Sequence, residues 1–196
     1  MRIIVFTIII FAIIIFSTCQ STPNTFAPTT ELSDKFPEDW LGTWAGMLII
    51  SKPGKDTMQV PMQLYCAEND TLTNGWDWHI IYGADTKAGR RAYTLHTRDA
   101  AKGHYAIDEH NGIILDAHLL GGTLYSRFAV SGNLLTTMTR KVGESMIFEV
   151  ISGKQTPVNI TGNIKDIPEV QSFNISVQQR AILSRVQIRE KAVNSQ

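Results

Sequence analysis

From Trp40 onward, short runs of alternating apolar and polar residues are separated at close intervals by turn residues. No stretch of this region keeps an apolar period of about 3.6 residues over three helical turns. Alternation with a period of two is typical of strands with one buried face, and tight turns between them favour an antiparallel meander. The pattern predicts nine strands, at residues 42–51, 57–67, 76–83, 91–97, 104–109, 113–120, 124–130, 134–141 and 145–151.

The predicted fold class is all-β, an up-and-down meander of about nine to ten strands closed into a barrel. An open sheet of this width would leave two unpaired edges, and the pattern offers no helices to cover a face. After Gly153 the alternation weakens, and residues 156–168 have the composition of a linker. Val170–Val177 is predicted to be a tenth strand or an edge cover. Val177–Lys191 has high helix propensity, which favours a short C-terminal helix packed on the barrel, with a disordered tail as the alternative.

Gly42, Thr43 and Trp44 open the first predicted strand. This Gly-x-Trp start resembles that of the calycin superfamily, which includes lipocalins and avidins. The resemblance covers about residues 40–151 and implies a barrel whose bottom is crossed by the tryptophan, often against a basic residue from a late strand. Arg140 or Lys141 would be that residue here. No helix pair follows the first strand, so a lipocalin-like or avidin-like barrel is the nearer match than a fatty-acid-binding protein.

The first nineteen residues show a different pattern: a positive charge at Arg2, an apolar run over residues 3–16, and then Ser17, Thr18 and Cys19. The run is shorter than the roughly 20 apolar residues that a membrane-spanning helix needs, which favours a cleaved export signal. The last three residues resemble the lipobox of bacterial lipoproteins. The resemblance implies that Cys19 is lipidated and begins the mature protein. The alternative is an ordinary secretory signal.

These features divide the chain into a signal peptide at 1–18, a tether at 19–39, a barrel at 40–155, and a linker with an edge strand or helix at 156–196. The tether is rich in Ser, Thr and Pro, which is typical of a flexible spacer. We expect the lipid anchor to hold the protein at the bacterial cell envelope. Because Gln20 rather than Asp follows the cysteine, the outer membrane is expected rather than the inner.

Charge and cysteine content narrow the partners and the chemistry. Eighteen basic and eighteen acidic residues balance, so we expect no nucleic-acid partner and no membrane contact beyond the anchor. Cys66 is the only cysteine besides Cys19, and it alternates in phase with apolar residues. We therefore predict that Cys66 is a buried, unreactive thiol and that an apolar core, rather than disulfides, stabilises the fold.

One predicted strand carries a candidate ligand surface. Four residues alternate along it and share one face: Trp76, Trp78, Ile80 and Tyr82. If this face is inward, the aromatic residues line a ligand cavity, with Arg91, Tyr125 or Arg127 as the polar contact. The alternative is that the aromatic residues fill a narrow barrel. No cofactor is expected, and no His follows His118 to serve as a late axial ligand for haem.

A second candidate site lies on a predicted hairpin with the three-residue loop at 110–112. This loop places His104 opposite His118, with Asp116 two residues along the same face. Imidazole and carboxylate groups suit zinc or iron, so the three residues form a candidate metal site. A two-residue loop would shift the register by one and scatter them. A solvated strand face gives the same pattern and is the alternative.

Three common functional motifs are missing from the sequence: the Gly-x-Ser-x-Gly elbow of nucleophilic catalysis, the phosphate loop and the CxxC pair. We therefore expect a lipid-anchored envelope protein that binds a small apolar or amphipathic ligand. Two alternatives stay open. One is an envelope enzyme that uses the His104, Asp116 and His118 site, and the other is a filled barrel that binds an envelope protein and no small molecule.

Overall fold

The computed structural model describes residues 35–187. Its barrel strands are β1 (Gly42–Ser51), β2 (Met58–Glu68), β3 (Gly75–Tyr82), β4 (Arg90–Asp99), β5 (His104–Asp108), β6 (Ile114–Leu120), β7 (Thr123–Val130), β8 (Asn133–Val142), β9 (Ser145–Lys154) and β12 (Val177–Arg185). The ends of the nine predicted strands differ from the observed ends by at most three residues. Cys19 and most of the predicted tether lie outside the described residues.

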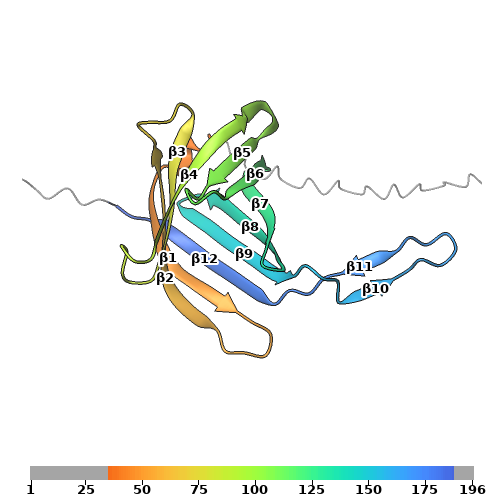
Figure 1. Ribbon diagram of the computed structural model, residues 1–196. Coiled ribbons are helices and arrows are strands. Elements are labelled where there is room, and N and C mark those ends of the chain that lie inside the picture. Colours follow the sequence, from red (N-terminus) through yellow and green to blue (C-terminus); the bar gives the residue numbers. More distant parts are fainter. Residues whose placement is uncertain (1–34, 188–196) are drawn as a thin grey trace, which may run out of the picture. The chain divides into compact units, whose positions relative to one another are not determined.

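Within the described residues, these ten strands form a closed barrel in the order β1-β12-β9-β8-β7-β6-β5-β4-β3-β2 (Figure 1). Neighbours along the chain pair as antiparallel hairpins from β1 to β9, so the predicted all-β meander closed into a barrel is confirmed. Between residues 35 and 187 the helices are two short 3₁₀ turns, η1 (Glu38–Trp40) and η2 (Ala100–Lys102). In the same range, no helix has the length and apolar character needed to cross a membrane.

The predicted C-terminal helix is wrong, because the segment forms strand β12. This strand pairs with β1 on one side and with β9 on the other, and so closes the barrel. A helix here would leave both neighbours with unpaired backbone edges, which outweighs the small intrinsic preference of these residues. Ala181 and Leu183 of β12 are buried in the core. The barrel therefore continues beyond residue 155, the predicted end of this domain.

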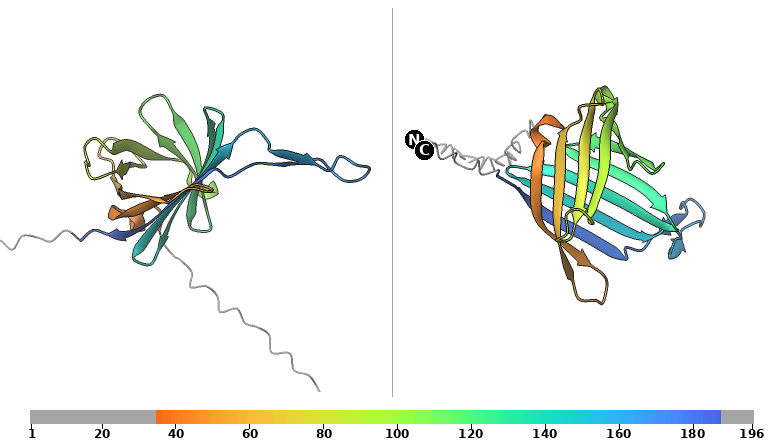
Figure 2. Two further views of the ribbon diagram at one scale, coloured as in Figure 1. Left: turned by 90° about the horizontal axis from the view of Figure 1, so that it is seen from below. Right: turned by 60° about the vertical axis from the view of Figure 1, so that its left-hand side comes forward.

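Between β9 and β12 the chain forms a separate two-stranded hairpin, β10 (Asn159–Thr161) paired with β11 (Val170–Ser172). In Figures 1 and 2 this hairpin extends outward from the ends of the two flanking barrel strands. Only three residues of the predicted strand 170–177 belong to β11. The hairpin and its flanks expose seven large apolar side chains: Val158, Ile160, Ile164, Ile167, Val170, Phe173 and Ile175.

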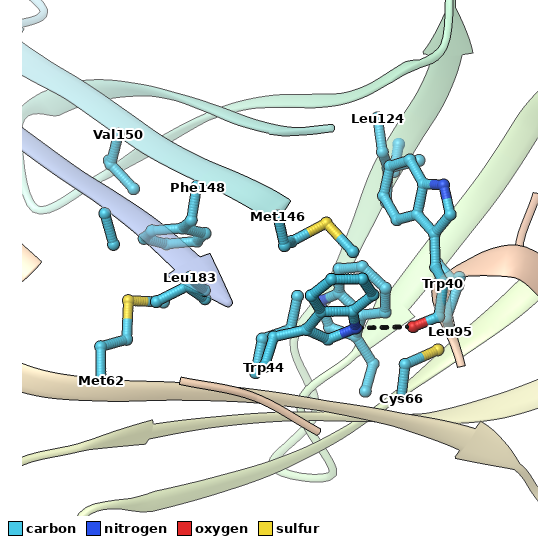
Figure 3. Close-up of a cluster of buried hydrophobic side chains, with 14 of the residues drawn as sticks. Trp40, Trp44, Met62, Cys66, Leu95, Leu124, Met146, Phe148, Val150 and Leu183 are labelled. Carbon is cyan, nitrogen blue, oxygen red and sulfur yellow. Dashed lines mark hydrogen bonds between the residues drawn. The ribbon is translucent and has the colours of Figure 1, made fainter. Parts of the chain in front are cut away.

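The core lies inside the barrel, where inward residues of neighbouring strands pair with one another. Trp44 of β1, for example, lies opposite Leu64 of β2 and Arg185 of β12. Figure 3 shows how apolar side chains from several strands pack together in this interior. The largest fully buried side chains are Trp40, Trp44, Leu48, Met62, Leu64, Leu95, Met146 and Leu183. Burial of apolar surface in such a closely packed core is the main favourable contribution to folding.

Cys66 belongs to the same core and is 1% exposed, so its predicted burial is confirmed. Burial, followed by the nearby charge of Asp77, raises the pKa of the thiol to about 12. The thiol is therefore protonated at neutral pH and is a poor nucleophile.

One end of the barrel is closed by the residues that precede β1. Helix η1 carries Trp40 into the interior, where its ring lies 6.2 Å from that of Trp78. Phe36 packs edge-on against both Trp40 and Tyr105. The indole Nε1 of Trp44 donates a hydrogen bond of 2.9 Å to the backbone oxygen of Trp40 (Figure 3). We call this the closed end of the barrel.

Arg185, near the end of β12, completes the closed end. Its guanidinium lies 4.2 Å from the ring centroid of Trp44 and donates hydrogen bonds to the backbone oxygens of Asp39 and Leu41. The calycin resemblance implied such a basic residue from a late strand, but the choice of Arg140 or Lys141 was wrong. Helix propensity predicts a helix over this segment, and only the observed strand β12 gives the register that places Arg185 opposite Trp44.

Candidate ligand site

A cavity of about 190 Å³ lies inside the barrel and is lined by residues from most of its strands. Nine of the lining residues are apolar: Trp78, Ile80, Ile107, Leu115, Leu124, Phe128, Leu135, Phe148 and Val150. Seven carry polar groups: Tyr82, Tyr93, Glu109, Ser126, Thr137, Thr139 and Gln179. An apolar cavity with a few polar groups is the usual composition of a small-molecule site.

Strand register explains why polar residues face this cavity. Ser126 pairs with Thr137 across β7 and β8, Thr137 pairs with Val150, and Val150 pairs with Gln179 of β12. These four residues form one row across the inner wall. The hydroxyl of Ser126 donates a hydrogen bond of 2.7 Å to the backbone oxygen of Asp116, so its proton already has an acceptor within the protein. Its oxygen keeps lone pairs that can accept a hydrogen bond from a ligand.

Tyr82 and Tyr93 place two phenol groups in the same wall. Burial raises the pKa of Tyr82 to about 12, with Tyr93 adding to the shift and Arg91 opposing it. Burial also raises the pKa of Tyr93, and the charge of Glu109 adds to that shift while Arg91 opposes it. Both phenols are therefore neutral at physiological pH and can donate as well as accept hydrogen bonds.

The structure places the ligand residues predicted from the sequence in different surroundings. Trp78 and Tyr82 line the cavity. Trp76 lies on the same inner face, as the alternation of β3 requires, but packs against the core without bordering the cavity. Arg91 pairs with Ile80 on the inward register, yet its side chain is exposed and does not form part of the cavity wall.

Tyr125 and Arg127 do not border the cavity as predicted, because both lie on the outer face of β7. Successive residues of a strand point to opposite faces, and it is Ser126, between them, that lines the cavity. Arg127 borders a separate surface hollow together with Phe173. The polar group that β7 presents to the cavity is therefore the hydroxyl of Ser126 rather than a guanidinium.

Several lining residues were missed by the sequence analysis. Tyr93 is in phase with Arg91, which was predicted to face the cavity, so alternation along β4 could have found it. Ser126 is out of phase with Tyr125 and Arg127, so choosing the other face of β7 was needed to find it. Glu109 follows from the register of the β5–β6 hairpin, which was correct. Gln179 could not be found, because it lies on β12, the segment that was predicted to be helical.

The candidate metal residues meet as the predicted hairpin register requires. His104 pairs with His118, and their rings stack in nearly parallel planes with centroids 4.8 Å apart. The Nε2 atom of His104 lies 2.7 Å from Oδ1 of Asp116, and this hydrogen bond lowers the pKa of the carboxyl. Across residues 35–187, no group of three His, Cys, Asp or Glu side chains is arranged to hold a metal ion. The geometry is that of a His–Asp hydrogen bond beside a stacked ring on the outer surface.

Comparison with known proteins finds similarity in fold alone. No family model and no curated protein sequence matches the chain. A solved protein of unknown function from the DUF3598 family of Nostoc punctiforme has a TM-score of 0.53 and 12% identity over 76% of this chain. This chain spans about half of that structure, 48% of its length. An S-type phycobiliprotein lyase from Guillardia theta has a TM-score of 0.48 and 8% identity, over 76% of this chain and 89% of that one.

Proposed function

We propose that this protein is a lipid-anchored binding protein of the bacterial cell envelope, whose barrel holds a small apolar or amphipathic ligand. The observation that carries the proposal is the cavity of about 190 Å³ inside the barrel, with nine apolar residues in its wall. An apolar cavity of about 150 Å³ engineered in another protein is large enough to bind benzene. The cavity in this barrel therefore has room for one aromatic ring or a short alkyl chain.

The distribution of packing along the barrel supports this proposal. At the closed end, Trp40, Trp44 and Leu95 are fully buried and fill the interior. Farther along, Ile80, Tyr82 and Leu135 are only partly buried and face the cavity instead. A barrel whose interior served only as a core would gain dispersion energy by filling this space, since empty volume in a core lowers stability.

The experiment that tests ligand binding places a ring inside the cavity or on the outer face of the same strand. Thr137→Phe fills the cavity, whereas Thr136→Phe adds the same group to the outer face one residue away. Titration with n-octanol, followed by tryptophan emission and calorimetry, should show binding to the wild type and to Thr136→Phe. Binding to Thr137→Phe should be at least about tenfold weaker, because the ring and the alkyl chain compete for one volume.

Circular dichroism of both variants is the control, since each must keep the β spectrum of the wild type. Absence of octanol binding to the wild type would contradict the proposed function. Equal binding to all three proteins would also contradict it, because octanol would then bind outside the barrel.

The proposed anchor rests on the apolar run at residues 3–16 that ends in Ser17, Thr18 and Cys19. Acyl chains contribute about 0.8 kcal/mol per buried CH₂, so several chains on one cysteine would hold the protein at the membrane. In a Gram-negative host, the wild type should incorporate labelled fatty acid and fractionate with the outer membrane. Cys19→Ala should lose the label and enter the soluble periplasmic fraction. Equal release of both proteins would rule out lipidation.

A further inference from the structure

The charge of the cavity wall sets a constraint on the polar end of a ligand. Among the described residues that line the cavity, Glu109 alone carries a formal charge. It follows β5 at the start of the β5–β6 loop, where its backbone N–H donates to the oxygen of Ile113 at 3.0 Å. The Oε2 atom of Glu109 accepts a hydrogen bond of 3.3 Å from Asn111. A carboxylate accepts more than one such bond, so Glu109 keeps capacity to accept from a ligand.

Two tyrosines in the same cavity wall as this carboxylate are suited to a cation. The charge of Glu109 helps to raise the pKa of Tyr93, and this residue contributes a neutral hydroxyl and an aromatic ring. Tyr82 contributes a second neutral hydroxyl. An ammonium group donates three hydrogen bonds, which a carboxylate and two phenol oxygens can accept, and aromatic rings attract cations as well.

The same wall is unfavourable for a ligand that ends in a carboxylate. It would be desolvated beside Glu109, and like charges at close range in a partly dry site are unfavourable. The cationic side chain of Arg91 acts on Tyr82 and Tyr93, whose pKa it lowers, but it is exposed and lies outside the wall.

We propose that the cavity prefers ligands whose apolar body ends in an ammonium group, which Glu109 binds with the hydroxyls of Tyr82 and Tyr93. This inference rests on the proposed function, since it concerns the same cavity, and it adds the chemical class of the ligand.

Three probes with one alkyl chain and different head groups test the inference: n-octylammonium, n-octanol and n-octanoate. Calorimetry at pH 7 should rank their affinities in that order. The octylammonium should bind about tenfold more tightly than the octanol, the gain typical of one hydrogen bond to a charged group. This ratio is measured on the wild type and needs no variant.

Glu109→Gln should remove the preference, so that octylammonium binds no more tightly than octanol while the affinity for octanol stays the same. Arg91→Gln is the matched control, because it removes the neighbouring charge outside the wall and should preserve the ranking. Octanoate binding as tightly as octylammonium, with that binding lost in Arg91→Gln, would overturn the inference and leave the proposed function intact. Failure of all three probes to bind the wild type would overturn both.

Discussion

Trp44 in the first strand of the barrel and Arg185 in the last strand together close one end of it. Its ring lies between the core and the guanidinium of Arg185, and its indole N–H is satisfied by the backbone of Trp40. The Gly-x-Trp pattern at the start of the first strand identified this residue, because its resemblance to the calycin start implied a tryptophan packed across the barrel bottom. The basic partner was misplaced, since it comes from the segment with high helix propensity.

Truncation of Trp44 should be among the most destabilising single changes in the barrel. Trp44→Ala removes a fully buried indole, and such changes typically cost about 3 to 5 kcal/mol in the free energy of unfolding. Met47→Ala is the matched control, because Met47 lies on the outer face of the same strand and is 43% exposed. Surface changes of this kind usually stay within about 0.5 kcal/mol. Urea denaturation measures both, and a loss below about 1 kcal/mol for Trp44→Ala would contradict its place in the core.

At the scale of elements, the outcome of each prediction followed from whether local or long-range contacts decide the structure. Strands β1 to β9 are consecutive antiparallel neighbours, so their alternation and their turns are enough to predict them. The loop at 110–112 fixed the register of His104 opposite His118 for the same reason. Strand β12 differs, because it follows a separate hairpin and pairs with β1, the most distant strand in the sequence. Intrinsic propensity could not reveal a pairing partner more than a hundred residues away.

The same distinction separates the parts of the candidate site that could be predicted from those that could not. The aromatic face of β3 was inferred from alternation within one strand, and Trp78 and Tyr82 do line the cavity. Which face of β7 points inward depends on its register with β8, and a shift of one residue exchanges Tyr125 and Arg127 for Ser126. The cavity volume depends on side chains from many strands together, so no single pattern in the sequence specifies it.

At the scale of the whole molecule, the barrel has a tightly filled end and an end with a cavity. The filled end is held by η1, β1 and β12, and it contributes much of the buried apolar surface. The cavity is bordered by residues of β3, β4, β7 and β8, and Glu109, which follows β5, supplies the charge. Under the proposed function, this division of the interior separates stability from binding, so a change in the cavity wall would alter affinity while the closed end maintains the fold.

The central claim is that the cavity holds a small molecule, and mass spectrometry of an organic extract tests it most directly. The Cys19→Ala protein, purified without detergent so that nothing competes for the cavity, should yield a small apolar or amphipathic compound at close to one molecule per chain. The same protein with Thr137→Phe added should yield none of it. Extracts that contain no such compound from either protein, or equal amounts of it from both, would contradict the claim.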